Sequence, residues 1–330
     1  MATASADFDA LVHHVTSSYA GYEDKSTGRL DLLKDLTATV RTRFLAVAST
    51  EERTALLREW LAFFNDQHMG LISRNEPHAD RALAPDDRRG GLQIRELNPE
   101  TMLIRVPTFH PSLAEPLDQL LATHRDDLRS HLYLILDLRG NGGGDDTVFH
   151  GLVPLLYTRP IKLVGVDYRA SAENAEHIRS LSHRRDLPDE ARTHLRSIVK
   201  LMEASPDSMV PGVPDQIIEL PEVLPRPERI AILIDHACVS STEQFLLLAK
   251  QSDKVILLGQ RTRGCLDYSN LRQIELPSGQ HVLRLPTSRS RRLPDQGIDG
   301  RGIEPDVWIS EAEVDPVAVA CATLVRSRRS

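Results

Sequence analysis

The chain has 330 residues, of which 41% are hydrophobic and 26% are charged. This composition is ordinary for a globular protein and excludes the collagen-like, disordered and disulfide-scaffold classes. The length predicts about two domains, or one large core with an appendage. The formal net charge of −7 argues against nucleic acid as a main partner. No apolar run approaches the roughly 18 residues of a membrane span, so no membrane insertion is expected.

The three cysteines, Cys238, Cys265 and Cys321, lack a C-x-x-C spacing, so neither a disulfide framework nor a zinc ribbon is predicted. A single Cys238–Cys265 bridge stays open as an alternative. No histidine pair has the spacing of a helical metal site, and no metal or other cofactor is expected. Residues 1–15 lack the basic and apolar regions of a signal peptide, which predicts a cytoplasmic protein, or a periplasmic or secreted one if a leader precedes it.

The N-terminal part of the chain predicts helices. Apolar residues recur at spacings of three and four through residues 7–66, and Ser49–Glu52 is a capping-box sequence that begins a third helix. Periodicity is lost over 74–93, where Pro, Asp, Arg and Gly dominate. We therefore expect a helical N-terminal domain at 1–73 and a linker or mobile loop at 74–95.

From about residue 95 onward, strand-like apolar runs alternate with helical stretches. Strands are predicted at 102–106, 131–138, 161–166, 229–235, 254–259 and 305–309. Helices are predicted at 112–128, 145–157, 189–204, 241–251 and 314–326. A hairpin with Ser278 and Gly279 at its turn precedes the last strand. This alternation implies a layered α/β or α+β core at 96–330.

A glycine-rich segment follows one of the predicted buried strands. Within 134–146, glycines at 140, 142, 143 and 144 leave the backbone bare, so its N–H groups can approach a ligand closely. The Lys and Ser/Thr of a phosphate loop are absent. The segment therefore favours an oxyanion hole, with a tight strand-to-helix turn as the alternative.

Ser240 lies where a second buried strand gives way to a helix. A serine at this position projects from the end of a sheet in front of helix N–H groups, as nucleophiles often do. Ser240 and Glu243 also form a capping-box pattern, which is the structural alternative. His68, two residues after Asp66, is a third candidate, although a lone histidine is more often structural.

Taken together, these segments resemble peptidase family S41, which holds the C-terminal processing proteases, the tricorn core protease and the retinoid-binding IRBP modules. The matching blocks are Asp66–His68, Asp137–Gly144, Ser240–Glu243, Leu258–Gly264 and Gly302–Asp306, in the family's order. The resemblance covers about 55–310 in scattered blocks and implies a ClpP/crotonase-like layered sheet core with helices.

The resemblance implies a peptidase that lacks a PDZ domain and a catalytic lysine. Only about 30 residues separate His68 from the first core strand, too few for a PDZ fold, so tail recognition by a PDZ groove is not expected. Processing proteases carry their lysine directly after T-x-G, where this chain has Cys265; Lys250 and Lys254 lie elsewhere. Cys265 is expected to be a structural thiol.

Tricorn-type members instead pair the serine with a histidine from the N-terminal part, oriented by a carboxylate. His68 and Asp299 occupy the matching positions here. The resemblance thus implies that Ser240 is the nucleophile, that His68 is the general base and that Asp299 orients the imidazole. His236, four residues before Ser240, is the rival base.

The remaining site residues follow from the same resemblance. The oxyanion hole is expected at the N–H groups of Gly143, or Gly142, and Ser241, and the cleft is expected to be lined by Thr262 and Gly264. The substrate would be a peptide or protein segment, cleaved through an acyl-enzyme. The alternatives are an esterase with the same triad, a non-catalytic IRBP-like module for hydrophobic ligands, and a crotonase that handles acyl-CoA.

Overall fold

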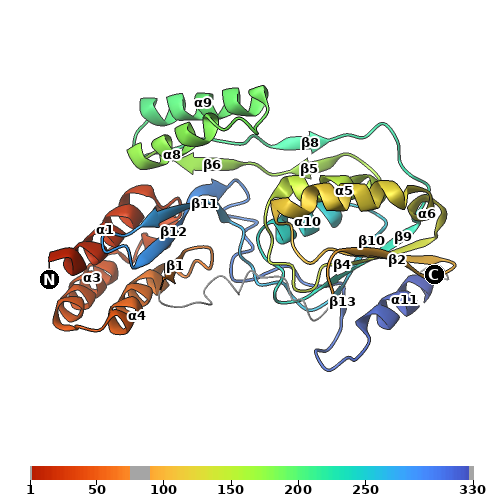
Figure 1. Ribbon diagram of the computed structural model, residues 1–330, viewed down its shortest axis with the longest axis horizontal. Helices are drawn as coiled ribbons and strands as arrows, with labels where there is room; N and C mark the ends of the chain where they lie inside the picture. Colours follow the sequence, from red (N-terminus) through yellow and green to blue (C-terminus); the bar gives the residue numbers. More distant parts are fainter. Residues whose placement is uncertain (1, 75–89, 327–330) are drawn as a thin grey trace. The chain divides into compact units, whose positions relative to one another are not determined.

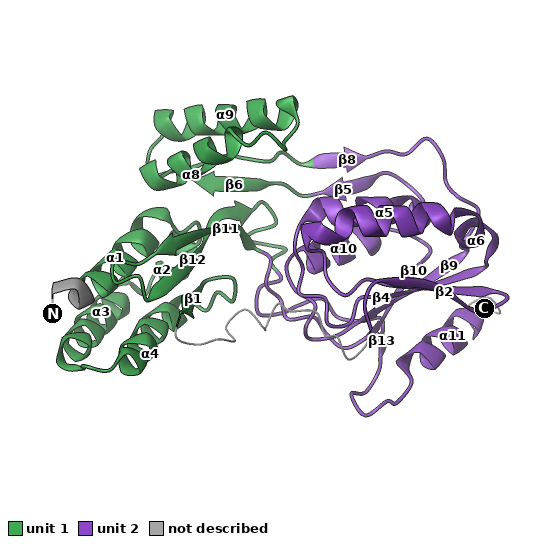
Figure 2. Ribbon diagram, in the orientation of Figure 1, with its two compact units in different colours: residues 1–79, 164–215, 267–297 green, residues 80–163, 216–266, 298–330 purple. Residues whose placement is uncertain are grey.

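A computed structural model describes residues 2–74 and 90–326 of the chain. The chain divides into two compact units, each built from three separate segments (Figure 2). The first unit holds residues 1–79, 164–215 and 267–297, and the second holds 80–163, 216–266 and 298–330. The division predicted from the sequence differs from this one, because 164–215 and 267–297 lie with the N-terminal helices. The predicted linker lies largely outside the described residues, but its end is already part of a strand.

The first unit combines helices with an antiparallel sheet. Its helices are α1 (Ala2–Ser18), α2 (Tyr22–Ser26), α3 (Leu30–Ala46), α4 (Thr50–Leu61), α8 (Ala172–Ser182) and α9 (Asp189–Ala204). The sheet has the order β1-β12-β6-β7, with β11 paired to the other side of β12. These strands are β1 (Gly70–Ser73), β6 (Val166–Arg169), β7 (Met209–Pro211), β11 (Tyr268–Glu275) and β12 (His281–Ser290).

One apolar core explains why distant segments join this unit. Phe8 of α1 and Trp60 of α4 are buried with Leu283 and Leu285 of β12 in the same cluster. The predicted cap also forms, since the Ser49 hydroxyl accepts a hydrogen bond from the Glu52 N–H at the start of α4. The hairpin β11–β12 thus completes the core that the N-terminal helices cannot close by themselves.

The second unit is built on a six-stranded sheet with the order β13-β10-β9-β4-β3-β2. Neighbouring strands are parallel, except that β2 and β3 are antiparallel. The strands are β2 (Gln93–Asn98), β3 (Thr101–Arg105), β4 (Tyr133–Asp137), β9 (Arg229–Ile234), β10 (Val255–Gly259) and β13 (Val307–Trp308). A separate antiparallel pair joins β5 (Ile161–Leu163) and β8 (Gln216–Ile218).

Helices cover both faces of this sheet (Figure 1). One face carries α5 (Ala114–Thr123), α6 (Arg125–Ser130), α7 (Val153–Leu156) and α10 (Ser241–Ala249), and the other carries α11 (Pro316–Arg326). Leu134 and Leu136 of β4 face the first layer, whereas Tyr133 and Ile135 face the second. Burial on both faces explains the continuous apolar runs of the central strands. The predicted α/β layered fold is therefore confirmed.

Several predicted elements differ in detail. The strand predicted at 161–166 is divided between β5 and β6, which belong to different sheets. The helix predicted at 112–128 is α5 and α6 after a 3-10 turn at Pro111–Leu113, and that at 145–157 begins as a 3-10 helix, Asp146–Leu152. In the part of the chain that the structure describes, no helix is long and apolar enough to cross a bilayer.

Candidate active site

The backbone of Ser240 turns sharply between β9 and α10. Its φ and ψ angles are 58° and −125°, a conformation that residues other than glycine rarely adopt. Its N–H group donates to the Cys265 carbonyl, 3.0 Å away, and to the Glu243 carboxylate at 3.2 Å. A serine on a strained strand-to-helix turn is typical of a nucleophile, because such strain is retained where function requires it.

The glycine-rich segment passes directly beside Ser240. A Cβ atom at Gly143 would lie 2.9 Å from the Ser240 Cβ and 2.7 Å from the Val239 carbonyl oxygen, and Gly143 has a φ of +84°. Asn141 is completely buried and holds this segment, since its Oδ1 accepts hydrogen bonds from the Gly143 N–H and the Thr242 hydroxyl. Glycine is therefore required at position 143 both for its conformation and for the close approach.

Three backbone N–H groups were predicted for the oxyanion hole, and they differ in their partners. The Gly143 N–H donates to Asn141 at 2.9 Å. By contrast, the N–H groups of Gly142 and Ser241 have no hydrogen-bond acceptor among the residues that the structure describes. Ser241 also begins α10, where helix N–H groups point outward and attract negative charge. The N–H groups of Gly142 and Ser241 are thus donors that no described residue uses.

Glu243 holds the loop at 262–265, which lies next to the backbone of Ser240. Its buried carboxylate accepts hydrogen bonds from the Thr262 hydroxyl and from the N–H groups of Gly264 and Cys265, in addition to that of Ser240. Burial raises the pKa of the Glu243 carboxyl above its usual 4.5, and these donors offset part of that rise. The sequence analysis predicts only a helix cap at Glu243. An acidic residue in an otherwise largely apolar helix is the sequence feature that could have indicated its hydrogen bonds to the loop at 262–265.

The two residues predicted to line the cleft both have structural partners. The Thr262 side chain is completely buried, and its hydroxyl donates to Glu243 and accepts from the Ile303 N–H. Gly264 is buried with a φ of +77°, and a Cβ there would lie 2.4 Å from the Ile298 carbonyl oxygen. In this structure both residues therefore fix the loop at 262–265, and no open cleft surface is seen at the Thr262 side chain.

Asp299 lies in the turn that packs against this loop. The Gly300 N–H donates to the Gly264 carbonyl at 2.9 Å, and Asp299 Oδ1 accepts from the Leu266 N–H at 2.7 Å. The turn itself is closed by the N–H groups of Arg301 and Gly302, which donate to the Ile298 carbonyl. Asp299 is therefore fixed relative to the loop that follows β10.

His68 belongs to the first unit and is held by its own neighbours. Asp66 Oδ1 accepts the His68 N–H at 2.8 Å, and Asp66 Oδ2 accepts the Tyr19 hydroxyl at 2.7 Å. His68 is 8% exposed, and its Nδ1 lies 2.6 Å from the Tyr268 carbonyl oxygen. The family resemblance implies that Asp299 orients the imidazole; the contact of Nδ1 seen within the first unit is with a backbone carbonyl.

The two lysines considered as alternative bases, and the two cysteines near Ser240, each have partners of their own. The amino group of Lys250 pairs with Asp306 at 3.4 Å, and that of Lys254 donates to the Leu224 carbonyl at 2.5 Å. The possible disulfide is absent: Cys238 and Cys265 are buried and are not bonded to each other. The Cys238 thiol instead donates to the Leu138 carbonyl at 3.2 Å, and burial raises its pKa well above the usual value.

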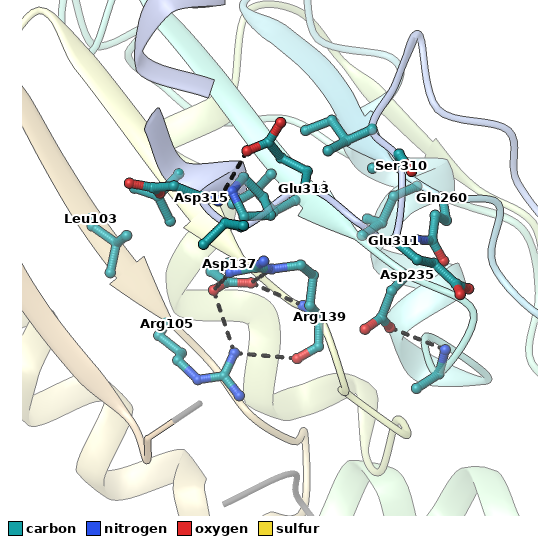
Figure 3. A pocket seen from close by; sticks show the side chains of 18 of the residues that line it. Leu103, Arg105, Asp137, Arg139, Asp235, Gln260, Ser310, Glu311, Glu313 and Asp315 are labelled. Atoms are coloured by element: carbon teal, nitrogen blue, oxygen red, sulfur yellow. Dashed lines mark hydrogen bonds and ion pairs between the residues drawn. The ribbon is translucent and has the colours of Figure 1, made fainter. Parts of the chain in front are cut away.

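A cavity of about 720 Å³ opens at the edge where the parallel strands end. In it Arg139 binds Asp137 through two hydrogen bonds, and Arg105 approaches the same carboxylate (Figure 3). Exposed His236 lines this cavity, and Ser240 is not among its lining residues. Across the described residues, no group of three or more His, Cys, Asp or Glu side chains is arranged to hold a metal ion.

Comparisons with known proteins agree with this architecture. Residues 100–309 match the model of peptidase family S41. No curated protein matches the chain. Among solved structures, mature CPAF complexed with lactacystin is 12% identical, with a TM-score of 0.67 and coverage of 99% of this chain and 98% of that one. A lipoprotein from Streptococcus agalactiae is 18% identical, with a TM-score of 0.56 and coverage of 98% and 96%. The photosystem II D1 C-terminal processing protease is 11% identical, with a TM-score of 0.53 and coverage of 98% and 97%.

Proposed function

The chain belongs to peptidase family S41, a family of serine peptidases, and from this membership we propose a mechanism in which Ser240 acts with His68 rather than with a lysine. The observation that carries the proposal is the strained turn at Ser240, with the N–H of Ser241 unpaired beside it in the described chain. The lysine alternative loses support because Lys250 and Lys254 are engaged by Asp306 and Leu224.

In the proposed reaction, Ser240 Oγ attacks the carbonyl carbon of a peptide bond while His68 Nε2 takes the hydroxyl proton. The oxygen that becomes negative is held by the N–H groups of Ser241 and Gly142, or of Gly143 once it leaves Asn141. The intermediate collapses to an acyl-enzyme, and the leaving amine takes the proton from His68. Water then gives a proton to His68 and attacks the acyl carbon. The bond from that carbon to Ser240 Oγ breaks, His68 returns the proton to Oγ, and the acid leaves.

Asp299 is proposed as the carboxylate that stabilises the protonated imidazole. The Tyr268 carbonyl already orients Nδ1, so a negative charge would add electrostatic stabilisation rather than select the tautomer. If Asp299 supplies only charge stabilisation, Asp299→Asn is expected to lower activity less than His68→Ala does. Each oxyanion donor typically contributes about 3–4 kcal/mol to lowering the barrier.

Labelling by a fluorophosphonate tests the proposal. The intact chain is expected to be labelled at Ser240, and both Ser240→Ala and His68→Ala are expected to lose labelling and peptide turnover by at least about 10³-fold. Lys250→Met, Lys254→Met and His236→Ala serve as controls and should keep both. Loss of labelling in a lysine variant, or in His236→Ala but not His68→Ala, would refute the histidine assignment.

Paired peptide and ester substrates of the same sequence separate a peptidase from an esterase that uses the same groups. Cleavage of both is expected, because the acyl-enzyme is common to the two reactions. An intact, folded chain that is neither labelled nor active on either substrate would favour the ligand-binding alternative.

A further inference from the structure

The loop that carries His68 has no regular secondary structure, so its backbone is held by side chains. It runs from the end of a 3-10 helix, Ala62–Phe64, to the start of β1 at Gly70. Asp66 Oδ1 accepts the His68 N–H at 2.8 Å and lies 3.4 Å from the Met69 nitrogen. An aspartate that bonds to the backbone two residues further on fixes a turn. The position of His68 therefore depends on the direction in which the Asp66 carboxylate points.

Tyr19, the residue after α1, fixes that direction. Its hydroxyl donates to Asp66 Oδ2 at 2.7 Å, and Tyr19 and Asp66 are only 1% and 9% exposed. A hydrogen bond from a hydroxyl to a carboxylate is short and strong, and more so where water is excluded. The last side-chain torsion of an aspartate is otherwise broad and weakly restricted. The Tyr19 hydroxyl thus keeps Oδ1 turned toward the His68 N–H.

Tyr19 is itself held firmly within the first unit, which contains α1, α2 and the hairpin β11–β12 (Figure 2). Its ring centroid lies 5.7 Å from that of Tyr268 in β11. The next N–H group along the chain, that of Ala20, donates to the Pro286 carbonyl of β12 at 3.1 Å. Gly21 leaves room for the hydroxyl, because a Cβ there would lie 2.4 Å from the Tyr19 oxygen. Ring and backbone therefore both fix the place of this hydroxyl.

The imidazole ring of His68 is held from the same segment of the chain. The Tyr268 carbonyl oxygen lies 2.6 Å from His68 Nδ1, and the Tyr268 hydroxyl donates to Asp24 of α2 at 2.8 Å. Arg289 Nε donates to the same oxygen of Asp24 at 2.5 Å. Residues 19–24 thus support the His68 backbone through Tyr19 and its ring through Tyr268.

We propose that Tyr19 is a positioning residue of the peptidase reaction and that it acts through Asp66 on His68. The assignment rests on the proposed role of His68 as general base. A base must direct its lone pair at the proton of the nucleophile, and a displacement of about 1 Å can lower a rate about 100-fold. Because Tyr19 acts through another residue, loss of its hydroxyl should lower kcat and leave KM nearly unchanged.

Steady-state kinetics of the full-length chain tests this role. Tyr19→Phe removes only the hydroxyl and is expected to lower kcat about 10-fold, with a change in KM of less than about twofold. Tyr22→Phe is the matched control and should keep the parental rate, because the Tyr22 hydroxyl bonds to no residue that the structure describes. Equal values of kcat for the two variants would overturn the positioning role.

A double-mutant cycle shows whether the effect passes through Asp66. In an Asp66→Ala background, where the acceptor is already lost, Tyr19→Phe should change kcat less than about twofold. Effects that multiply would refute action through Asp66. Thermal unfolding checks that each variant is folded. If Tyr19→Phe does not fold, Gly21→Ala carries the same two measurements, because it crowds the hydroxyl and keeps the ring.

Failure of the positioning role is distinguishable from failure of the mechanism. If His68→Ala keeps the parental rate of fluorophosphonate labelling, His68 is not the base, and both assignments are overturned. If His68→Ala loses labelling while Tyr19→Phe is as fast as Tyr22→Phe, only the positioning role is overturned.

Discussion

The Nδ1 atom of His68 lies 2.6 Å from the carbonyl oxygen of Tyr268. A carbonyl oxygen can only accept a hydrogen bond, so Nδ1 is the donor in this contact, and the lone pair that a general base requires would be the one on Nε2. Because the acceptor is a backbone atom, replacement of the Tyr268 side chain does not remove it. The position of His68 depends instead on the loop that Asp66 holds.

The first prediction concerns Asp66. Asp66→Ala removes the acceptor for the His68 N–H and is expected to lower kcat about 10- to 100-fold, because small displacements of a catalytic group are costly. Asp66→Asn keeps an oxygen at that position and should retain most of the rate. Steady-state kinetics with a neutral peptide amide measures both variants. An Asn variant as slow as the Ala variant would contradict a positioning role.

The second prediction concerns the backbone at Gly143. Gly143→Ala places a methyl group against Ser240 and Val239 and should reduce fluorophosphonate labelling at least about 100-fold. Gly28→Ala is the matched control, since Gly28 has a φ of +73° but nothing within 4 Å of an added Cβ. Both variants bear a similar conformational cost of about 1–2 kcal/mol, so a difference in labelling isolates the contact with Ser240.

The third prediction concerns Glu243. Glu243→Ala removes the carboxylate that accepts from the Thr262 hydroxyl and the N–H groups of Gly264 and Cys265, and it should lower the free energy of unfolding by about 3 kcal/mol or more. Glu243→Gln keeps one acceptor oxygen and should cost less. Urea denaturation measures the two variants. Equal stability of Glu243→Ala and the parent chain would show that the loop at 262–265 does not depend on this carboxylate.

The fourth prediction concerns pH and Asp7 of α1. Burial raises the pKa of this carboxyl, but hydrogen bonds from His281 and Ser278 outweigh that effect and hold the pKa below its usual 3.8. A lowered folded-state pKa stabilises the fold above about pH 3.8, and the contribution is lost as the pH falls through the lowered value.

Asp7→Asn should therefore cost about 1–3 kcal/mol of unfolding free energy at pH 7, and the cost should shrink below pH 3.8. Thermal unfolding at a series of pH values measures the difference. Asp9→Asn, at an exposed position of the same helix, is the control for removing one carboxylate from the surface of α1. A cost for Asp7→Asn that grows on acidification would reverse the sign and disprove the assignment.

The second unit can be predicted from the sequence because its central strands are recognisable as short apolar segments. The residues of β3 and β4 are buried throughout, so each strand is a continuous apolar run bounded by turn residues. The same runs lead into the glycines and into Ser240, which placed the candidate nucleophile at the carboxyl edge of the sheet. Local pattern was sufficient there because strand and functional loop are adjacent in sequence.

The sheet of the first unit was not predictable from local pattern. Strands β1, β6 and β7 have three or four residues each and no clean alternation, and β1 pairs with residues more than 200 positions away. Helix α8 is largely polar. The sequence analysis does not predict the contacts of Glu243 with the loop at 262–265 or the contact of His68 with a backbone carbonyl. Most of these partners are backbone groups, whose positions cannot be inferred from residue type.

Because each unit is built from three separate segments of the chain, the units cannot be expressed separately by cutting the chain at one point. Cutting after residue 73 would separate β1 from β12 and expose Phe8 and Trp60, which are buried with Leu283 and Leu285. The complementary piece would carry a hairpin without the helices that bury it. Co-expression of both pieces would be needed to restore the shared interior.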